Sequence, residues 1–320
     1  MTRSLPLICL AGLVGWAPVP HAQSYPSKPI RMLVGFAAGG GVDLSARTVG
    51  QPLGAALGQT VVVDNRPGAA GNLAASVVAK STPDGYTLLM SNSTVSNPTL
   101  FKSLPFDVRK DLAPIALVAI GPSVLVVHPS VPARNIKDFI AYAKAQPKKL
   151  SYGSGGIGNI THLEMELFSS MTGARMTHVP YKGSAPSIIG LVSGEVQAVF
   201  SSVPSALAQI RTGKIVALAV TILKRSSVLP EVPTIDESGV PGYDAASWYA
   251  VFAPAGTPKP VIALLGKEVV RVMALPEVRG RFAADGFEPA GAGPAEFAKF
   301  LNAELVKWDK AIKAAGIQPE

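Results

Sequence analysis

Short apolar runs and longer amphipathic stretches alternate along the chain. The apolar runs, bounded by glycine, proline or polar residues, predict strands, and the amphipathic stretches predict helices. Near the beginning of the chain they predict a strand, helix, strand, helix and strand at Ile30–Val34, Asp43–Leu57, Val61–Val63, Asn72–Lys80 and Thr87–Met90. This order is typical of a parallel sheet covered by helices.

The same order of elements recurs further along, at Leu150–Tyr152, Asn159–Thr172, Thr177–Val179, Ser184–Val192 and Val196–Phe200. A proline-punctuated stretch from Ile115 to Val127 lies between the two repeats, and Ile215–Val220 and Ser247–Ala253 predict two more strands. One face of a helix near the C-terminus consists of Phe297, Leu301, Leu305, Trp308 and Ile312. We expect an α/β fold of two similar units, with the C-terminal part returning to the first unit.

Length and composition agree with two folded units. A chain of 320 residues exceeds the usual size of one domain. Hydrophobic residues make up 48% and charged residues 16%, which excludes a disordered chain and a coiled coil. The uncharged stretch from Leu112 to Ala133 is long enough to raise the question of a membrane span, but it contains Pro114, Pro122, Pro129 and Pro132. Because proline interrupts helices, we expect no span there.

The first 22 residues have the layout of a secretory signal peptide. Arg3 precedes an apolar segment from Leu5 to Trp16, and cleavage is expected after Ala22. Cys9 is the only cysteine of the sequence and has no small residue directly before it, so we expect neither a lipid anchor nor disulfides. We therefore predict a signal peptide over residues 1–22 and a periplasmic protein. The alternative is a buried N-terminal helix, which the glycines and prolines of this segment would interrupt.

The net charge of +8 does not indicate a nucleic-acid-binding protein. The basic doublets are isolated and aromatic residues make up only 7%, so the sequence lacks both a basic stripe and a stacking platform. A mild positive field instead favours small anions as partners. The alternative is that the basic residues are ordinary solvent-exposed side chains.

Two glycine-rich loops each follow a predicted strand and precede a predicted helix, at Gly35–Asp43 and Tyr152–Asn159. Glycine lets the backbone approach a ligand, and the first turn of a helix has unpaired N–H groups and a partial positive charge. Each loop is therefore a candidate anion site, with polar Asp43, Ser154 and Asn159 at or beside the helix starts. The alternative is a pair of plain tight turns, but their duplication favours binding.

Other kinds of site fit the sequence less well. Gly153, Gly155 and Gly158 match a dinucleotide-binding motif, but no acidic residue follows at the end of the next strand. His162 belongs to no zinc motif, and we expect neither a metal nor a cofactor. Ser154 with His162 supports the alternative hypothesis of an exported serine-dependent hydrolase or lyase acting on a carboxylic acid, although the first glycine of a nucleophile elbow is missing.

Longer motifs run in order along nearly the whole chain beyond the signal segment. They are Gly35–Asp43, Asp64–Asn72, Pro83–Leu88, His178–Ser184, Leu229–Thr234 and Pro254–Pro258. In these motifs the sequence resembles the substrate-binding proteins of tripartite tricarboxylate transporters, also called Bug receptors.

The resemblance implies a type II periplasmic-binding-protein fold, in which two α/β lobes enclose a ligand cleft and two crossing strands form the hinge. It places lobe I at residues 23–124 plus 247–320 and lobe II at residues 125–246. Members of the family hold a ligand carboxylate between two strand-to-helix loops. The ligand-binding residues implied here are Phe36, Ala37, Ala38, Gly39, Gly40, Gly41, Val42, Asp43, Ser91, Ser93, Thr94, Ser154, Gly155, Gly156, Ile157, Gly158, His162 and Ser201.

Two departures from the family pattern bear on the ligand. Gly35 stands where many members have proline, which loosens the first loop without removing its N–H groups. Ser201 and Ser202 follow a strand after which many members carry aspartate. A carboxylate that would pair with a ligand ammonium group is thereby lost, which leaves dicarboxylates, tricarboxylates and aromatic acids as candidate ligands.

The resemblance predicts a receptor rather than an enzyme. The receptor would be a monomer that captures a small carboxylate between its lobes and delivers it to a membrane permease of the tripartite tricarboxylate type. The alternative to delivery is a sensor role, in which the closed receptor is presented to a membrane kinase.

Overall fold

The computed structural model describes residues 25–92, 97–146, 149–314 and 316–317. The predicted signal peptide and the candidate ligand contacts Ser93 and Thr94 lie outside the described residues. The strands of the described chain are β1 (Ile30–Val34), β2 (Val61–Asn65), β3 (Thr87–Ser91), β4 (Leu112–Val127), β5 (Ser151–Ser154), β6 (Thr177–Pro180), β7 (Ala198–Ser202), β8 (Val216–Val220), β9 (Ala246–Pro254) and β10 (Glu288–Ala292).

Helices connect most of these strands. They are α1 (Gly41–Leu57), the 3-10 turn η1 (Ala69–Gly71), α2 (Asn72–Ala79), α3 (Asn97–Leu100), α4 (Ile136–Ala145), α5 (Ile160–Thr172), α6 (Ser184–Val192), α7 (Val203–Arg211), α8 (Lys259–Met273), α9 (Pro276–Ala284) and α10 (Pro294–Ala314). None of the helices in the described residues combines the length and the apolarity needed to cross a membrane.

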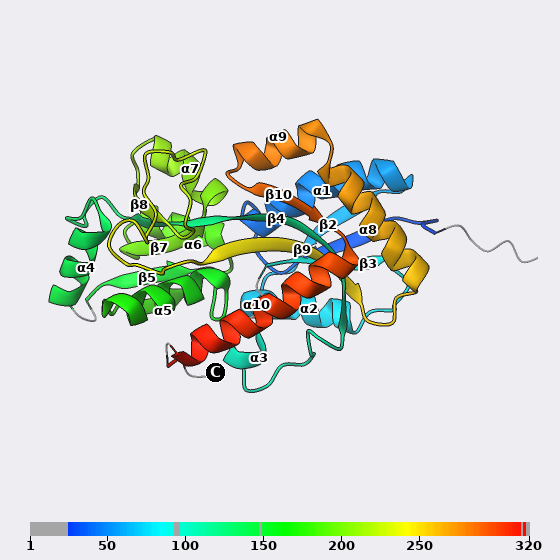
Figure 1. Ribbon diagram of the computed structural model, residues 1–320, viewed down its shortest axis with the longest axis horizontal. Helices are drawn as coiled ribbons and strands as arrows, with labels where there is room; N and C mark the ends of the chain where they lie inside the picture. The colour runs from blue at the N-terminus through cyan, green and yellow to red at the C-terminus, as the bar shows by residue number, and fades with distance from the viewer. Residues whose placement is uncertain (1–24, 93–96, 147–148, 315, 318–320) are drawn as a thin grey trace, which may run out of the picture.

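The strands follow the order β2-β1-β3-β9-β4-β7-β5-β6, and β8 and β10 also pair with β4. Strand β1 runs parallel to β2 and β3, and β5 runs parallel to β6 and β7. Each repeat of strand and helix predicted from the sequence thus forms its own parallel group, while β4 and β9 lie between the groups and pair antiparallel with their neighbours. Figure 1 shows the two groups side by side, joined by these long strands.

Strand β4 passes from one group to the other. It pairs with β9 as far as Pro122 and with β7 and β8 from Ser123 onward. Most of the uncharged, proline-containing stretch that raised the question of a membrane span forms this strand. Its register shifts next to Pro114, as expected where a residue without an N–H group enters a sheet. Because β4 belongs to both groups, no single residue in it marks a lobe limit, and the predicted limits stay a prediction.

Three apolar clusters stabilise the arrangement. One lies between the first sheet and α1 and α8, and another lies between the second sheet and α6 and α7. The largest extends through both halves and contains the buried face of α10, including Phe297 and Trp308. Helix α10 packs on β4 and contacts α3 and α8 as well as α5 of the second group (Figure 1). The assignment of the C-terminal part to lobe I therefore stays a prediction.

Candidate ligand-binding site

The first glycine-rich loop connects β1 to α1. Gly39 has a φ of +83°, a conformation that favours glycine, and the helix starts after Gly40 without a side-chain cap. A Cβ on Gly41 would lie 2.5 Å from the Tyr249 hydroxyl oxygen and 3.1 Å from the Ser202 Cβ. The sequence therefore brings the first turn of α1 into direct contact with β9 and with the end of β7, an approach that only glycine allows.

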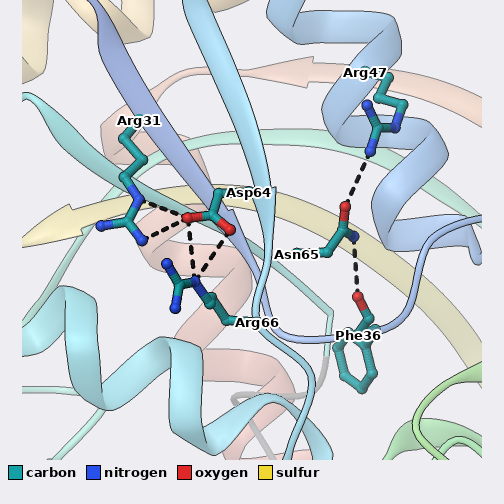
Figure 2. A network of polar contacts seen from close by, with 6 residues as sticks. All are labelled: Arg31, Phe36, Arg47, Asp64, Asn65 and Arg66. Atoms are coloured by element: carbon teal, nitrogen blue, oxygen red, sulfur yellow. Dashed lines mark hydrogen bonds and ion pairs between the residues drawn. The ribbon is translucent and has the colours of Figure 1, made fainter.

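A polar network holds this loop in place. The Asn65 side-chain amide donates to the Phe36 carbonyl (3.0 Å) and to Asp43 (2.9 Å), and Arg47 donates to the Asn65 side-chain oxygen (3.0 Å). Figure 2 shows Asn65 between Arg47 and Phe36, beside a second group in which Arg31 and Arg66 both bond to Asp64. The loop is thus tied to the end of β2.

Asp43, a predicted ligand contact, is buried and fully engaged within the chain. Its carboxylate accepts hydrogen bonds from the Gly39 N–H group (3.0 Å), from Arg47 and from Asn65. Burial by itself would raise the pKa of Asp43, but these donors and the Arg47 charge outweigh it and hold the pKa below its ordinary value. The ionised Asp43 carboxylate therefore stabilises the conformation of the loop through hydrogen bonds within the chain.

The second loop connects β5 to α5. Asn159 caps α5 by accepting a hydrogen bond from the Thr161 N–H group (3.0 Å), and the Thr161 hydroxyl accepts one from the Gly155 N–H group (2.8 Å). Gly156 and Gly158 have φ values of +119° and +82°, in the region that favours glycine. Local capping and glycine conformations therefore fix the shape of this loop.

Ser154 lies next to His178 and not next to His162, the histidine named in the hydrolase hypothesis. The Ser154 hydroxyl lies 2.6 Å from the His178 Nε2, while His162 stacks on His178 and accepts from the Gly158 N–H group through Nδ1. Burial, with a smaller contribution from His162, lowers the pKa of His178 to about 3, so its ring is neutral. Ser154 is fully buried, which is unsuitable for a nucleophile that must reach a substrate.

The first loop also contacts the second half of the molecule. The Ala37 N–H group donates to the Lys182 carbonyl (2.9 Å), and the Ser205 hydroxyl donates to the Gly39 carbonyl (3.2 Å). The two halves therefore meet across these loops in a closed arrangement.

A narrow cavity of about 20 Å³ lies between the halves. Its lining consists of neutral side chains and glycine backbone: Phe36, Gly40, Gly41, Val42, Asn92, Asn159, Ile160, Thr161, Ser184, Ser202, Ser247 and Tyr249. The N-terminal turns of both α1 and α5 belong to this lining, so their partial positive charges face the same space.

A second cavity, of about 190 Å³, shares Phe36 with the first one. It is lined by Gly35, Phe36, the turn Gly68–Ala70, the loop segment Gly155–Ile157 and the segment Pro180–Lys182. Ala69 and Ala70 have φ values of 46° and 50°, a conformation that costs free energy for residues other than glycine. The tip of the second loop therefore faces this cavity rather than the first one.

The predicted residues divide between these places. Four of them line the first cavity, namely Phe36, Gly40, Gly41 and Val42. On the second loop, Gly155, Gly156 and Ile157 line the second cavity. Ser154 instead bonds to His178, and His162 accepts a hydrogen bond from the Gly158 N–H group. The described residues that line neither cavity are Ala37, Ala38, Gly39, Asp43, Ser91, Ser154, Gly158, His162 and Ser201. A role of any of them in binding stays a prediction.

Sequence reasoning missed several residues of the first cavity. Asn92 directly follows β3, next to the predicted Ser91, and its buried side-chain oxygen has no hydrogen-bond partner among the described residues. Ser202 rather than Ser201 faces the cavity, because successive side chains of a strand point to opposite faces. Ser247 and Tyr249 come from β9, and no local signal in the sequence connects this strand with the glycine loops.

Comparisons with known proteins agree with this architecture. The family model described as "Tripartite tricarboxylate transporter family receptor" matches residues 45–317. Protein BugT of Bordetella pertussis (strain Tohama I) is 38% identical over 320 residues, covering 99% of this chain and 98% of its own.

Two solved structures are similar over nearly their whole length. The R. palustris protein Rpa4515, solved with adipate, is 37% identical with a TM-score of 0.89, over 92% of this chain and 100% of its own. MatC of Rhodopseudomonas palustris, solved with bound malate, is 30% identical with a TM-score of 0.85, over 90% of this chain and 100% of its own. The type II periplasmic-binding-protein fold expected from the resemblance is confirmed. With the family model matched over most of its length, this chain belongs to the tripartite tricarboxylate transporter receptor family.

Proposed function

We propose that this chain is a periplasmic solute-binding receptor that captures a small carboxylate between its two lobes and delivers it to a membrane permease of the tripartite tricarboxylate type. The observation that carries the proposal is the closed cavity between the two glycine loops, lined by neutral polar groups and by the first turns of α1 and α5. Helix N-termini that converge on one space favour an anion there.

The cavity offers donors rather than counter-charges. Ser184, Ser202, Ser247 and Tyr249 carry hydroxyl groups, whereas the Thr161 hydroxyl donates to Asn159 within the chain. The lining of the described chain contains no ionised side chain. Charge-assisted hydrogen bonds contribute about 1.5–3 kcal/mol each. Four or five of them would support binding on the order of micromolar, about 8 kcal/mol, after the costs of ordering.

The ligand class follows from the same lining and from the relatives. The Rpa4515 and MatC structures hold adipate and malate, both of which are dicarboxylates. A cavity whose described lining has no carboxylate offers no partner to an ammonium group, which argues against an amino acid. We therefore place dicarboxylates first among the candidate ligands, with tricarboxylates and aromatic acids next.

Calorimetry with matched ligands tests the capture step. Adipate, malate and citrate are compared with adipamide, in which the charges of adipate are removed, and with 1,6-diaminohexane, in which they are reversed. At least one acid is expected to bind one to one, with adipamide about a hundredfold weaker because it loses charge-assisted bonds. Binding of the diamide or the diamine as tight as that of every acid would contradict the proposal.

Delivery and absence of turnover need separate measurements. Mass spectrometry of the bound acid after long incubation is expected to recover it unchanged, because Ser154 is buried behind the loop. Deleting the gene is expected to abolish uptake of that acid, and the wild-type chain to restore it. Unchanged uptake in the deletion strain would exclude delivery and favour the sensor role.

A further inference from the structure

Three aromatic rings stack beside the second loop, and two of them belong to histidines. The His162 ring lies on the His178 ring with 4.2 Å between their centres, and Tyr152 stacks on His178 at 4.8 Å. His162 is on α5, Tyr152 on β5 and His178 on β6. None of the three lines either cavity, although the resemblance to the family implied a ligand contact for His162. The position of His162 therefore calls for another explanation.

His162 holds the residue at which the second loop passes into α5. Asn159 caps this helix, so His162 occupies its third position, and the His162 Nδ1 accepts a hydrogen bond from the Gly158 N–H group (3.2 Å). A side chain at this position commonly reaches back to a free N–H group at the start of a helix. Gly158 has a φ of +82°, in the region that favours glycine, so the bond fixes the chain at a sharp turn.

The bond lies between the two cavity linings. Residues Gly155–Ile157, directly before Gly158, line the second cavity, and residues Asn159–Thr161, directly after it, line the first one. Gly158 is thus the one residue of this run that lines neither cavity. A shift of its backbone would move the linings of both.

The direction of this bond fixes the state of the imidazole ring. A backbone N–H group can only donate, so the His162 Nδ1 carries a lone pair and the proton of the neutral ring is on Nε2. Nε2 lies 4.0 Å from the Glu166 Oε1, which accepts a hydrogen bond from the Tyr152 hydroxyl (2.6 Å). A second proton would go to Nδ1 and would place two donors against each other, because a doubly protonated ring accepts no hydrogen bond.

Two influences act in opposite directions on a proton at His162. The Glu166 carboxylate favours it, whereas the burial of the His162 side chain, which is 10% exposed, disfavours it. The neighbouring His178 stays neutral, because burial and then His162 lower its pKa to about 3. At any higher pH, a change of charge within the histidine pair therefore belongs to His162.

The other described elements packed against α5 bring neutral, paired or exposed groups. Strand β7 and helix α3 contain no titratable residue. On α5 itself, burial raises the pKa of Glu164 well above its ordinary value, which favours the neutral acid. On α10, Glu304 accepts from Trp308 (3.1 Å), Asp309 accepts from Lys313 (2.9 Å), and the lysines are exposed.

We propose that His162 is a positioning residue of the ligand site and makes capture depend on pH: its neutral ring holds Gly158 and the adjoining cavity linings in place, and a proton on Nδ1 breaks this bond and weakens binding of the acid. The inference rests on the proposed function, because it concerns the affinity for that ligand. Direct contact of a cationic His162 with the ligand would have the opposite effect, since a positive ring attracts a carboxylate. The sign of the pH dependence therefore separates the two roles.

Nitrogen-15 NMR of the ligand-free protein tests the geometry. At about pH 8, above the ordinary pKa of imidazole, His162 is expected to show an unprotonated Nδ1 and a protonated Nε2, in a signal that is lost in His162→Asn. As the pH is lowered, the Gly158 amide signal is expected to shift with the same midpoint as this ring. A proton on Nδ1 at the start, a ring that takes up no proton while the protein stays folded, or a Gly158 signal that does not follow the ring would overturn the proposal.

His128 is the matched control for these measurements. Its Nδ1 accepts a hydrogen bond from the Ser130 N–H group (3.2 Å), and it lines neither cavity. His128→Asn is therefore expected to leave the titration of the Gly158 signal unchanged. Loss of that titration in the control variant would assign the effect to His128 and overturn the proposal.

Calorimetry with adipate and malate tests the positioning role. His162→Leu is expected to weaken binding about tenfold, the effect of one hydrogen bond. His162→Asn is expected to restore most of this loss, because the asparagine oxygen can replace Nδ1 as the acceptor for Gly158 and does not titrate. His128→Leu and His128→Asn are expected to leave affinity unchanged. Equal affinity of wild type and His162→Leu, or no rescue by asparagine, would overturn the proposal.

The ratio of the wild-type affinity to that of His162→Asn isolates the effect of the ring, because protonation of the ligand affects both proteins alike. This ratio is expected to fall about tenfold as the pH is lowered through the midpoint of the His162 signal. A rising ratio would indicate a cationic ligand contact and a constant ratio a purely structural role, and either would overturn the proposal. If no acid binds to the wild type while the Gly158 signal follows the ring, the proposed function fails and the coupling of His162 to Gly158 stands.

Discussion

Gly41 is the residue at which α1 comes nearest to the opposite wall of the cavity. A Cβ there would lie 2.5 Å from the Tyr249 hydroxyl oxygen, so the helix or the Tyr249 side chain would have to shift. Nothing in a run of three glycines tells which of them makes this approach. The sequence therefore predicted the glycine-rich loop between β1 and α1, and the contact of Gly41 with Tyr249 became visible only with β9 in position.

Gly41→Ala is expected to weaken binding of the preferred acid at least tenfold and to destabilise the fold by about 1–3 kcal/mol, the usual cost of overpacking. Calorimetry and urea unfolding measure the two effects. Gly280→Ala is the matched control, since a Cβ on this helical glycine has nothing within 4 Å. It is expected to leave binding unchanged and to stabilise α9 by up to about 1 kcal/mol. Equal effects of the two substitutions on affinity would contradict the role of Gly41.

Asp43 gives the first loop a pH dependence. Its pKa is lower in the folded protein than in the unfolded chain, so its contribution to stability is complete above the unfolded pKa and is lost as the pH falls through the folded pKa. We expect the difference in unfolding free energy between wild type and Asp43→Asn to be largest near pH 7 and to shrink in acid. Asp309→Asn, at an exposed pair with Lys313, should have a smaller effect. A difference that stays constant down to acid pH would contradict this assignment.

At the scale of elements, the sequence predicts the helices and strands whose ends are marked by glycine or proline, and it does not predict the long strand β4. The helix at Ser184–Val192 and the strand at Ile30–Val34 were predicted with their observed bounds, because glycine and proline mark their ends. Strand β4 was not predicted as one strand, since its prolines argue against a central position. Pairing with β9 on one part and with β7 on the other supplies the stability that its local sequence does not indicate.

The cap of α5 is expected to matter for both stability and binding. Asn159→Ala removes the acceptor for the Thr161 N–H and hydroxyl groups, which should cost about 0.5–2 kcal/mol and weaken ligand binding severalfold because Thr161 lines the cavity. Asn135→Ala, which removes the matching cap of α4 on Asp138, is the control. It should cost similar stability in urea unfolding and leave calorimetric affinity unchanged. A loss of affinity in both variants would indicate a general effect of destabilisation.

At the scale of the whole molecule, the loops close the site by contacts between the two halves. The Ser205 hydroxyl on α7 donates to the Gly39 carbonyl, and the Ala37 N–H group donates to the Lys182 carbonyl, although neither Ser205 nor Lys182 lines the first cavity. A ligand that fits only the closed form would shift the population toward it by its differential affinity. The closed arrangement is thus stabilised by protein contacts, to which a bound ligand would add its own.

Ser205→Ala is expected to weaken ligand binding by about threefold to tenfold, because one hydrogen bond of the closed form is lost. Small-angle X-ray scattering should show compaction of the wild type on ligand addition and a higher ligand requirement for the variant. Ser170→Ala, which removes a hydroxyl that bonds only to the Leu167 carbonyl of its own helix, is the control and should titrate like the wild type. Identical curves for Ser205→Ala and wild type would contradict the role of this contact.

The sequence by itself determined the two repeats of strand and helix, the two glycine-rich loops and the family, because these depend on local periodicity, glycine conformation and motifs that run in order. The tertiary structure alone decided which groups share the cavity. Asn92, Ser202 and Ser247 lie on or directly after strands that are far apart in the chain. Such neighbours are set by strand pairing and packing between distant segments, which leave no local pattern in the sequence.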